Sequence, residues 1–495
     1  MKQLNTIAVA LAIAVAGLCP AGTRAQDASP AISVKLVPVV DRLHLVTDIN
    51  VVGNWVFICT QPGVLMRKNL ASLSTHDASV FLDIRPKVGM LGARIPALAG
   101  LGYPTPGTYD ERGLLGFVAD PAFATNGRFW IWYSNIGQFS NPPNFFQWTV
   151  STTQPWNMAR YDHVDYLDEY KVVDGVPKFM RTLLKLKRPY FNHTGFQSLV
   201  WSPEHKTLVL GLGDGGSEYD PNNIAQDDRQ LSGKLIKIDL AKLAGMDFRN
   251  TAPVATFADL AARGVPADAF KTLVKGLRNP SKVHYEQTSE PAGDGFRWIK
   301  YLANTGQDTI EFLHGFDHYG INFGFRAWEG NFPTSLAATS DDPARTIMYA
   351  VEATHLPNYY RPLVVYSHLD AATNHPHANT GSALYLGDRI PGLKGDLVFI
   401  DWITFDKSPP QGQLMYASVN RAKLQRANAV HVFNVDLSAA GLTSTQPLFF
   451  TSINTDPAGK RLFVGGFKDF QFVVNQRQAV GSTGLGGALY EVVPK

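Results

Sequence analysis

The sequence predicts an all-β fold, a six-bladed β-propeller with inserted loops and one short helical connection. Short runs rich in β-branched and aromatic residues recur from residue 34 to the end, each bounded by Gly, Pro, Asn or Asp. The 43 Gly and 31 Pro residues are spread along the whole chain, which is typical of many short elements separated by turns. A turn-strand unit also repeats, and such repetition indicates four-stranded sheets arranged around an axis.

The strands are expected in a regular succession. The clearest are 54–60, 127–134, 206–213, 234–240, 395–402 and 460–466. The repeating unit is Asp-Pro or Ser-Pro, a turn, and a strand that ends near Gly; it is seen in 120–134, 202–213 and 456–466. Segment 257–276 is the exception, because it is helix-like and too polar for the core of a blade, so we expect an inserted connection there. No Gly/Ser linker or low-complexity segment divides 34–495, which predicts a single domain.

The first 25 residues are expected to be a secretion signal peptide, cleaved after Ala25. Lys2 supplies the positive start, an apolar stretch runs from Ile7 to Leu18, and Thr23 and Ala25 are the small residues before the cleavage point. The apolar stretch is too short for a membrane anchor. We therefore expect a periplasmic or secreted protein without a membrane anchor.

Charge and cysteine content narrow the function classes. The whole chain has 45 basic and 42 acidic residues and no block of Lys or Arg. This balance argues against nucleic acid and anionic membrane surfaces as partners. Cleavage after residue 25 would leave Cys59 as the single cysteine, so no internal disulfide is expected and the core alone must hold the fold.

Several segments match, in order, the motifs of one known enzyme family. They are ERGLLGFVADPAFATNGRFWIWYS (111–134), NHTGFQSLVWSPEHKTLVLGLGDGG (192–216), LSGKLIKID (231–239) with GLRNP (276–280), NTGQDTIEFL (304–313) with GINFGFRAWEG (320–330), and more weakly 380–402. In this the chain resembles the soluble PQQ-dependent glucose/sorbosone (aldose sugar) dehydrogenase family, where PQQ is pyrroloquinoline quinone. The resemblance implies a six-bladed propeller that binds PQQ and calcium near its axis. It also implies a sugar substrate and a separate electron acceptor.

His193 is the candidate general base. It stands in Asn192-His193-Thr194, just before an apolar run, and the residues alone leave open a structural loop histidine, a glycosylation sequon or a base. A neutral imidazole titrates in the right range to take a hydroxyl proton. The resemblance places His193 at the family's base, which accepts that proton as hydride leaves for the quinone. Asn192 stands where the family has an acid, so the base would be oriented differently.

Arg278 and Asn279, in GLRNP, match the family pair beside the quinone. A fixed guanidinium stabilises the negative charge that builds on a quinone oxygen when hydride arrives. Arg278 is therefore a candidate catalytic and cofactor-binding residue, and Asn279 a cofactor-binding one. The structural alternative is a turn arginine that pairs with a surface acid.

The segment 304–311 sits where the family binds calcium, partly through backbone carbonyls. Gly306 and Gln307 would supply those oxygens, with Asp308 and Glu311 as nearby carboxylates, since a hard cation prefers oxygen ligands. Gln307 is also a candidate cofactor contact. An ordinary turn is the alternative.

Two other loops carry polar clusters. The oxygen-rich segment 213–223 is predicted to be a tight turn between blade strands rather than a second calcium site. His375 and His377 share one face if their segment is extended, and they fall near the family's quinone-contacting stretch, which makes them candidate cofactor contacts. Ligation of a transition metal by the two histidines is the alternative, although no third ligand is evident.

The chain also departs from the family at the positive charges that hold the PQQ carboxylates. Leu386-Gly387 stands where the family has a lysine, and 447–459 lacks the family's Arg-x-Arg pair. Either PQQ is held less tightly, or other cations take over, with Arg326, Lys394 and Arg421 as candidates.

The sequence therefore predicts an exported PQQ-dependent dehydrogenase that oxidises an aldose sugar or related polyol. Two alternatives stay open at this stage. One is a non-catalytic propeller that acts as a binding module, and the other is a metal-dependent propeller hydrolase of the lactonase type. Fold analogy alone does not choose among them.

Overall fold

The computed structural model describes residues 31–88, 111–135, 161–190, 192–216, 219–292, 295–334, 343–369, 378–404, 411–443, 446–468, 471–473, 478–480 and 485–495. The expected signal peptide (1–25), His375 and His377 lie outside these residues. Ile32–Lys495 forms one compact unit. Among the described residues, no helix is long and apolar enough to cross a membrane.

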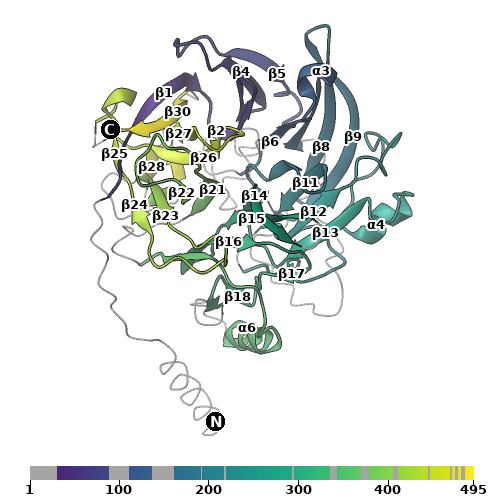
Figure 1. Cartoon of the computed structure of the whole chain (residues 1–495). Helices are drawn as coiled ribbons and strands as arrows, with labels where there is room; N and C mark the ends of the chain where they lie inside the picture. The colour runs from purple at the N-terminus through teal and green to yellow at the C-terminus, as the bar shows by residue number, and fades with distance from the viewer. Residues whose placement is uncertain are drawn as a thin grey trace. The chain divides into compact units, whose positions relative to one another are not determined.

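Six sheets are arranged around a central axis, which confirms the predicted six-bladed β-propeller (Figure 1). The first blade contains β2 (Val46–Val52), β3 (Trp55–Thr60), β4 (Val64–Asn69) and β5 (Ser79–Asp83). The second contains β6 (Leu114–Ala119), β7 (Arg128–Asn135), β8 (His163–Val173) and β9 (Val176–Arg188). The third contains β10 (Leu199–Ser202), β11 (Thr207–Leu212), β12 (Lys234–Ile238), β13 (Phe270–Lys275) and, parallel to it, β17 (Ile321–Asn322).

The other three blades complete the ring. The fourth contains β14 (Pro280–Ala292), β15 (Gly295–Asn304), β16 (Ile310–Phe316) and β20 (Val364–Ser367). The fifth contains β21 (Asn379–Leu384), β22 (Leu397–Thr404), β23 (Gln411–Ala417) and β24 (His431–Val432). The sixth contains β26 (Phe449–Thr455), β27 (Leu462–Phe467), β30 (Gly487–Pro494), β1 (Ser33–Leu43) and β25 (Asn434–Asp436). The innermost strands β2, β6, β10, β14, β21 and β26 contact one another in cyclic order.

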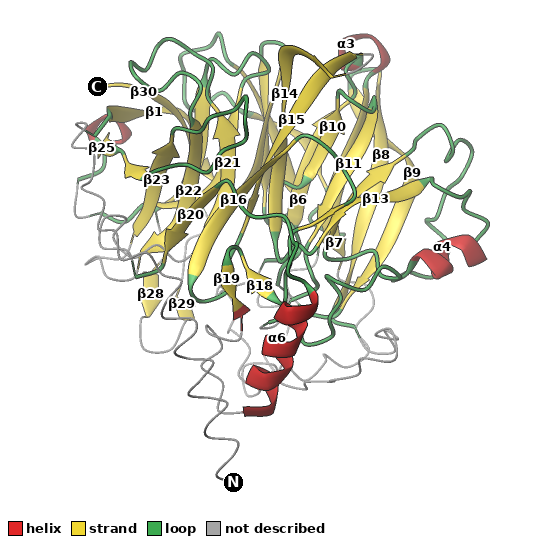
Figure 2. Ribbon diagram, turned by 60° about the horizontal axis from the view of Figure 1, so that its bottom comes forward, coloured by secondary structure: helices red, strands yellow, loops and turns green. Residues whose placement is uncertain are grey.

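Smaller elements lie outside the blades, among them the helices α3, α4 and α6 labelled in Figure 2. Two short hairpins are β18 (Trp328–Glu329) with β19 (Phe332–Pro333), and β28 (Gln471–Val473) with β29 (Gln478–Val480). The helices are α3 (Phe123–Asn126), α4 (Phe257–Ala262), α6 (Pro343–His355) and the 3₁₀ turn η3 (Ser438–Ala440).

The last blade is closed by both ends of this unit. β1 pairs antiparallel with β30, with Leu36 opposite Val492, and parallel with β25, with Val34 opposite Val435. The chain's first described strand thus lies between strands from its last part. This pairing, in the outer part of the sixth blade, joins the two ends of the ring.

Burial on both faces explains why the strand runs read as continuous apolar stretches. In β7, Trp130 and Trp132 pack against the third blade, including Leu199, whereas Phe129 and Ile131 on the opposite face pack in the cluster shared with the first blade. Successive side chains of a strand point to opposite faces, so a blade between two neighbours needs apolar residues at every position. The six strands expected from sequence are all found, with ends within two residues of those expected.

The prediction for 257–276 was only partly right. Thr256 caps α4 through the N–H of Asp259, and α4 ends at Ala262, before Gly264 with φ of 73°. The second half of the segment is β13, the fourth strand of the third blade. The polar composition of the segment predicted a connection outside the blades, whereas Phe270 of β13 is buried in the core. The helix α6 was not predicted.

Polar side chains from opposite blades meet across the axis. Lys282 of β14 lies 2.6 Å from Oδ1 of Asp48 in β2 and donates to Oδ1 of Asn50 at 2.9 Å. Both ions are buried, and the pairing offsets the cost of removing each charge from water. Gln197 donates to the carbonyls of Thr380 and Thr451 at 3.2 and 3.3 Å. These contacts tie distant blades together beneath the loops described next.

Candidate active site

The candidate residues gather at one end of the propeller, which we call the site end. It is formed by the segments 192–198, 213–216, 278–279 and 305–309 together with Glu111. Each segment directly precedes an inner strand or follows a second strand. Because those strands run antiparallel, the start of one and the end of the next lie at the same edge of a blade.

His193 is held by its backbone in a left-handed conformation, with φ of 54°. Its N–H donates to Oε2 of Glu111 at 2.6 Å, and the same oxygen accepts from Nδ2 of Asn279 at 3.3 Å. Oδ1 of Asn279 accepts from the N–H of Gly195 at 3.1 Å. Glu111 and Asn279 thus join the loops before the second, third and fourth blades around the histidine.

The ring of His193 is oriented by Asp214. Nδ1 lies 2.7 Å from Oδ1 of Asp214, and that oxygen also accepts from the N–H of Gly216 at 2.8 Å. A carboxylate on Nδ1 favours the tautomer in which Nδ1 carries the proton, so Nε2 keeps its lone pair. The missing acid at Asn192 is therefore replaced by a carboxylate from another loop, and Nε2 is the atom that can accept a proton.

The surroundings keep this ring neutral. Burial, together with the positive charges of Arg278 and Arg188, holds the pKa of His193 well below 6.5, and Glu111 opposes them only in part. Burial raises the pKa of Asp214 to about 7. A neutral base next to a carboxylate of this pKa suits proton transfer near neutral pH.

Arg278 does not pair with a surface acid. The side chain is 8% exposed; its Nε donates to Oε1 of Gln307 at 2.9 Å, and within the described residues it has no carboxylate partner. Its backbone N–H and that of Asn279 donate to Oδ1 of Asn304 at 3.1 and 3.0 Å. Arg278 thus provides a positive charge near His193, and the same charge favours the ionised form of Asp214.

The loop 305–309 turns its N–H groups inward. Oε1 of Glu329, a fully buried side chain, accepts from four consecutive N–H groups at 2.8–3.1 Å, those of Gln307, Asp308, Thr309 and Ile310. Glu311 is used in the same way: one oxygen accepts from the N–H of Gly306 at 2.8 Å, and the other lies 2.9 Å from Nε2 of His368.

The carbonyl oxygens of Gly306 and Gln307 are available as ligands for a cation, since neither accepts a hydrogen bond from any described residue. Asp308 accepts from the hydroxyl of Tyr219. Over the described part of the chain, no group of three or more His, Cys, Asp or Glu side chains is placed to hold a metal. A cation here would be bound mainly by carbonyl oxygens, with Glu311 as a structural carboxylate behind the loop.

In the described part of the segment 213–223, the residues 213–216 and 219–223, the two acids have separate roles. Gly215 and Gly216 have φ of 106° and 102°, as a tight turn requires. Asp214 contacts His193, whereas Asp220 accepts from the N–H groups of Ile224 and Ala225, each at 2.8 Å. Asp214 and Asp220 thus bond to different groups, and the interpretation of the whole segment as a turn stays a prediction.

The glycosylation interpretation of 192–194 is not supported. Thr194 is fully buried, and its hydroxyl donates to the carbonyl of Glu111 at 2.9 Å. Its hydroxyl is thus part of the packed site end rather than of a surface loop.

The substitute anchors named from sequence are already engaged. The ion pairs are Arg326 with Glu352 (2.7 Å), Lys394 with Asp388 (2.7 Å) and Arg421 with Glu286. Arg278 is therefore the cation with which the described site end can meet a carboxylate or quinone oxygen. One buried amide donor near it, Nδ2 of Asn304, has no partner within the described residues. This donor set fits the quinone end of PQQ better than its carboxylates.

Sequence reasoning missed Asp214 and Glu111. Asp214 follows the end of β11 in GLGDGG, and Glu111 precedes β6 in ERGLLG. Both lie at strand ends on the edge that also carries His193, and this shared position was the available signal.

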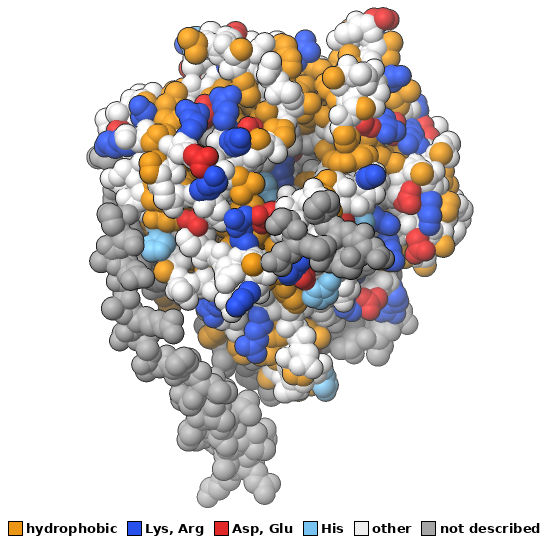
Figure 3. Space-filling view, in the orientation of Figure 1, with side chains coloured by type: hydrophobic (Ala, Val, Ile, Leu, Met, Phe, Trp, Pro, Cys, Tyr) orange, Lys and Arg blue, Asp and Glu red, His pale blue; other side chains and the backbone are white. Residues whose placement is uncertain are grey.

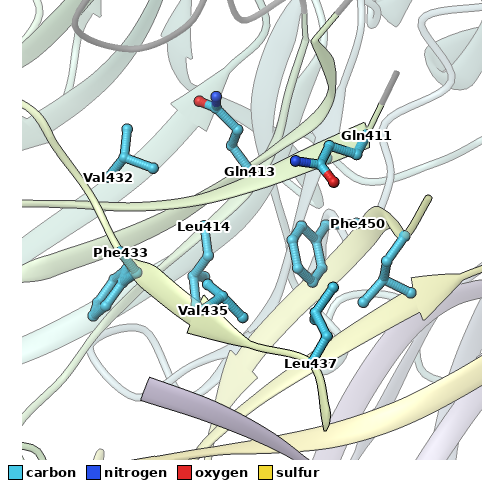
Figure 4. A pocket seen from close by; sticks show the side chains of 10 residues that line it. Gln411, Gln413, Leu414, Val432, Phe433, Val435, Leu437 and Phe450 are labelled. Atoms are coloured by element: carbon cyan, nitrogen blue, oxygen red, sulfur yellow. The ribbon is translucent and has the colours of Figure 1, made fainter. Parts of the chain in front are cut away.

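A separate cavity of about 210 Å³ lies between the fifth and sixth blades (Figure 4). Leu414, Phe433, Val435, Leu437 and Phe450 line it, and none of the site-end residues does.

Acidic and basic side chains are mixed over the face of the molecule shown in Figure 3, so neither sign of charge dominates that face.

Comparison with known proteins supports the fold. The chain matches no protein-family model. The HIPL1 protein of Arabidopsis thaliana is 24% identical over 377 residues, which cover 70% of this chain but only 49%, about half, of that protein. The PQQ-bound aldose sugar dehydrogenase of Streptomyces coelicolor superposes with a TM-score of 0.53 at 14% identity, over 94% of this chain and 100% of that chain. The soluble aldose sugar dehydrogenase of Escherichia coli, in its apo form, gives 0.53 at 18% identity with the same coverage. These matches confirm the predicted resemblance at the level of the fold.

Proposed function

We propose that this chain is an exported quinoprotein dehydrogenase that oxidises an aldose sugar or related polyol. The observation that carries the proposal is the buried His193–Asp214 pair, which has the Arg278 charge and the Asn279 amide beside it. The structural relatives described above, one of them PQQ-bound, support the choice of reaction class.

In this proposal His193 takes the hydroxyl proton of the substrate on Nε2. Asp214 keeps Nδ1–H pointing away from the substrate and stabilises the imidazolium that forms. Glu111 fixes the backbone of His193, and Asn279 links that contact to the next loop. Arg278 adds to the effect of burial, which keeps the ring neutral before the reaction, and it would place positive charge where negative charge develops.

PQQ would be held by Arg278, Asn279 and Gln307, and when bound it would supply the two-electron acceptor for the substrate's hydride. The fit is strongest at the guanidinium, which has no carboxylate partner in the described chain. Calcium would be held by the carbonyls of Gly306 and Gln307. His375 and His377 stay candidate cofactor contacts.

The proposed location follows from the predicted signal peptide in residues 1–25, and the partners would be a small sugar and an electron acceptor. Sequencing the amino terminus of the secreted or periplasmic protein tests the location. A mature chain that begins at Gln26 is expected, and a retained Met1 in the exported fraction would contradict it.

A non-catalytic binding propeller is the second candidate. The observation in its favour is that Arg326, Lys394 and Arg421 are all engaged in ion pairs, so tight capture of the PQQ carboxylates has no evident substitute anchor. Adding PQQ and calcium to the purified protein separates the two candidates. A dehydrogenase gains a bound-quinone absorbance and oxidises aldoses with an artificial electron acceptor, whereas a binding module does neither.

A further inference from the structure

Arg188, the last residue of β9, bonds to the backbone on both sides of the His193–Asp214 pair. Its side chain is 0% exposed. One NH group donates to the carbonyl of His193, and the other lies 3.4 Å from the carbonyl of Gly213 and 2.8 Å from Oγ of Ser232. Gly213 directly precedes Asp214, so one guanidinium holds the main chain of both members of the pair.

The main chain at His193 needs such support. A φ of 54° is unfavourable for a residue with a Cβ atom and persists only where its surroundings impose it. The packing there is also tight, because a Cβ built on Gly213 would lie 2.0 Å from the carbonyl oxygen of His193. The carbonyl therefore occupies space that only glycine leaves free, and Arg188 is the donor that fixes it there.

Arg188 is itself balanced by a buried chain of charges. Its Nε lies 3.3 Å from Oδ2 of Asp165, and Oδ1 of Asp165 lies 3.1 Å from Nε2 of His163. Nδ1 of His163 lies 2.8 Å from Asp162, which pairs with Arg112 at 3.1 Å. All five side chains are buried, so the arrangement is costly to disturb and keeps the guanidinium in one place.

We propose that Arg188 is a positioning residue, which fixes His193 and Asp214 relative to each other and tunes the protonation of the ring. The catalytic part of this inference rests on the proposed function. Four charged groups surround the ring: Arg188 and Arg278 favour the neutral form, whereas Glu111 and Asp214 favour the protonated form. Loss of Arg188 therefore has two consequences, a displaced base and a ring that binds its proton more readily.

Titration of His193 tests the second consequence without any turnover. Histidine labelled with ¹³C at Cε1 is introduced into the full chain, and the His193 resonance is identified by its loss in His193→Gln. The double variant Arg188→Met/Asp165→Asn removes the buried guanidinium charge together with its carboxylate partner. In this variant we expect the midpoint of the His193 titration to rise by about one pH unit. An unchanged midpoint in a folded variant overturns the proposal.

Kinetics test the first consequence. Arg188→Lys keeps the charge but cannot reach two carbonyls, and we expect kcat to fall by about tenfold or more with KM little changed. Arg181→Lys is the matched control: Arg181 is also in β9 and also links a carboxylate, Glu169, to two carbonyls, those of Leu243 and Met246. Equal losses in the two variants would overturn the positioning role. If the parent protein itself does not oxidise sugars, the proposed function fails, while the titration still decides the role of Arg188.

Discussion

Nδ1 of His193 lies 2.7 Å from Oδ1 of Asp214, although the two residues come from different loops of the third blade. This contact gives the histidine a defined tautomer in a chain that lacks an acid directly before it. It also places the proton-accepting nitrogen, Nε2, away from the carboxylate. The chemistry proposed for this protein depends on that one orientation.

Replacing Asp214 by Asn tests the orientation. The amide preserves the size of the side chain but can donate to Nδ1, which would move the ring proton to Nε2 and remove the base. We expect turnover to fall by about 10²-fold or more with little change in the melting temperature. Asp227→Asn, at a half-buried carboxylate paired with Arg229, is the control and should retain parent activity. Parent activity in Asp214→Asn would show that the carboxylate does not orient the base.

The pH dependence follows from the same pair. Asp214 has a pKa raised to about 7 by burial, and the pKa of His193 is well below 6.5. As pH falls through about 7, Asp214 binds a proton and no longer favours Nδ1–H; at lower pH the ring itself is protonated. We expect the rate to fall on the acid side, with a midpoint near or below pH 7. A rate that stays level down to pH 5 would be incompatible with this base.

The loop 305–309 should depend on Glu329. Its carboxylate accepts four N–H groups and so directs the carbonyls of Gly306 and Gln307 outward. Elemental analysis of the parent after mild dialysis should show roughly one calcium per chain. Glu329→Gln weakens this set of bonds, and we expect it to lower both the calcium content and the stabilisation that added calcium gives. Glu352→Gln, outside this loop, is the control. If the parent protein contains no calcium and its melting temperature does not change with a chelator, the loop 305–309 is an ordinary turn rather than a calcium site.

Acid should destabilise the fold through two histidines, the fully buried His314 and the partly buried His284. Burial lowers the pKa of His284 and of His314 to about 3, compared with about 6.5 for an exposed ring. Between these values the unfolded chain binds protons that the folded chain does not, so stability is lost as pH falls below 6.5 and levels off near 3. His314 stacks on Phe323 at 3.7 Å between ring centroids, and His314→Phe should reduce the drop in melting temperature between pH 7 and pH 4. His318→Phe, at an exposed histidine, should leave this drop in melting temperature unchanged. Equal drops in the two variants would contradict the role of His314 in acid destabilisation.

The repeated strands could be predicted because both faces of each blade are buried, which imposes long apolar runs such as β7. The repeated turn-strand unit could be predicted for the same reason. The strand β13 could not be predicted. Its buried residue Phe270 stands in a polar segment that begins with the helix α4. Local pattern gave the wrong answer where packing against the blade decided the structure.

Within the site, sequence motifs identified His193, Arg278 and Asn279, which the fold brings to one end of the propeller. The partners of these residues could not be identified in the same way. Asp214, Glu111 and Arg188 act through contacts between loops that lie far apart in sequence, and acids at turns are common. Only the closed ring shows which of them meet the histidine.

The most direct test of the central claim is reconstitution of the purified protein with PQQ and calcium, followed by aldose oxidation with an artificial electron acceptor. The parent should bind the quinone and oxidise at least one aldose. His193→Ala should bind the quinone equally well, but its turnover number should be lower by about 10²-fold or more. The exposed His318→Ala should match the parent. A parent that never binds PQQ, or a His193→Ala variant that oxidises sugars at the parent rate, would contradict the account.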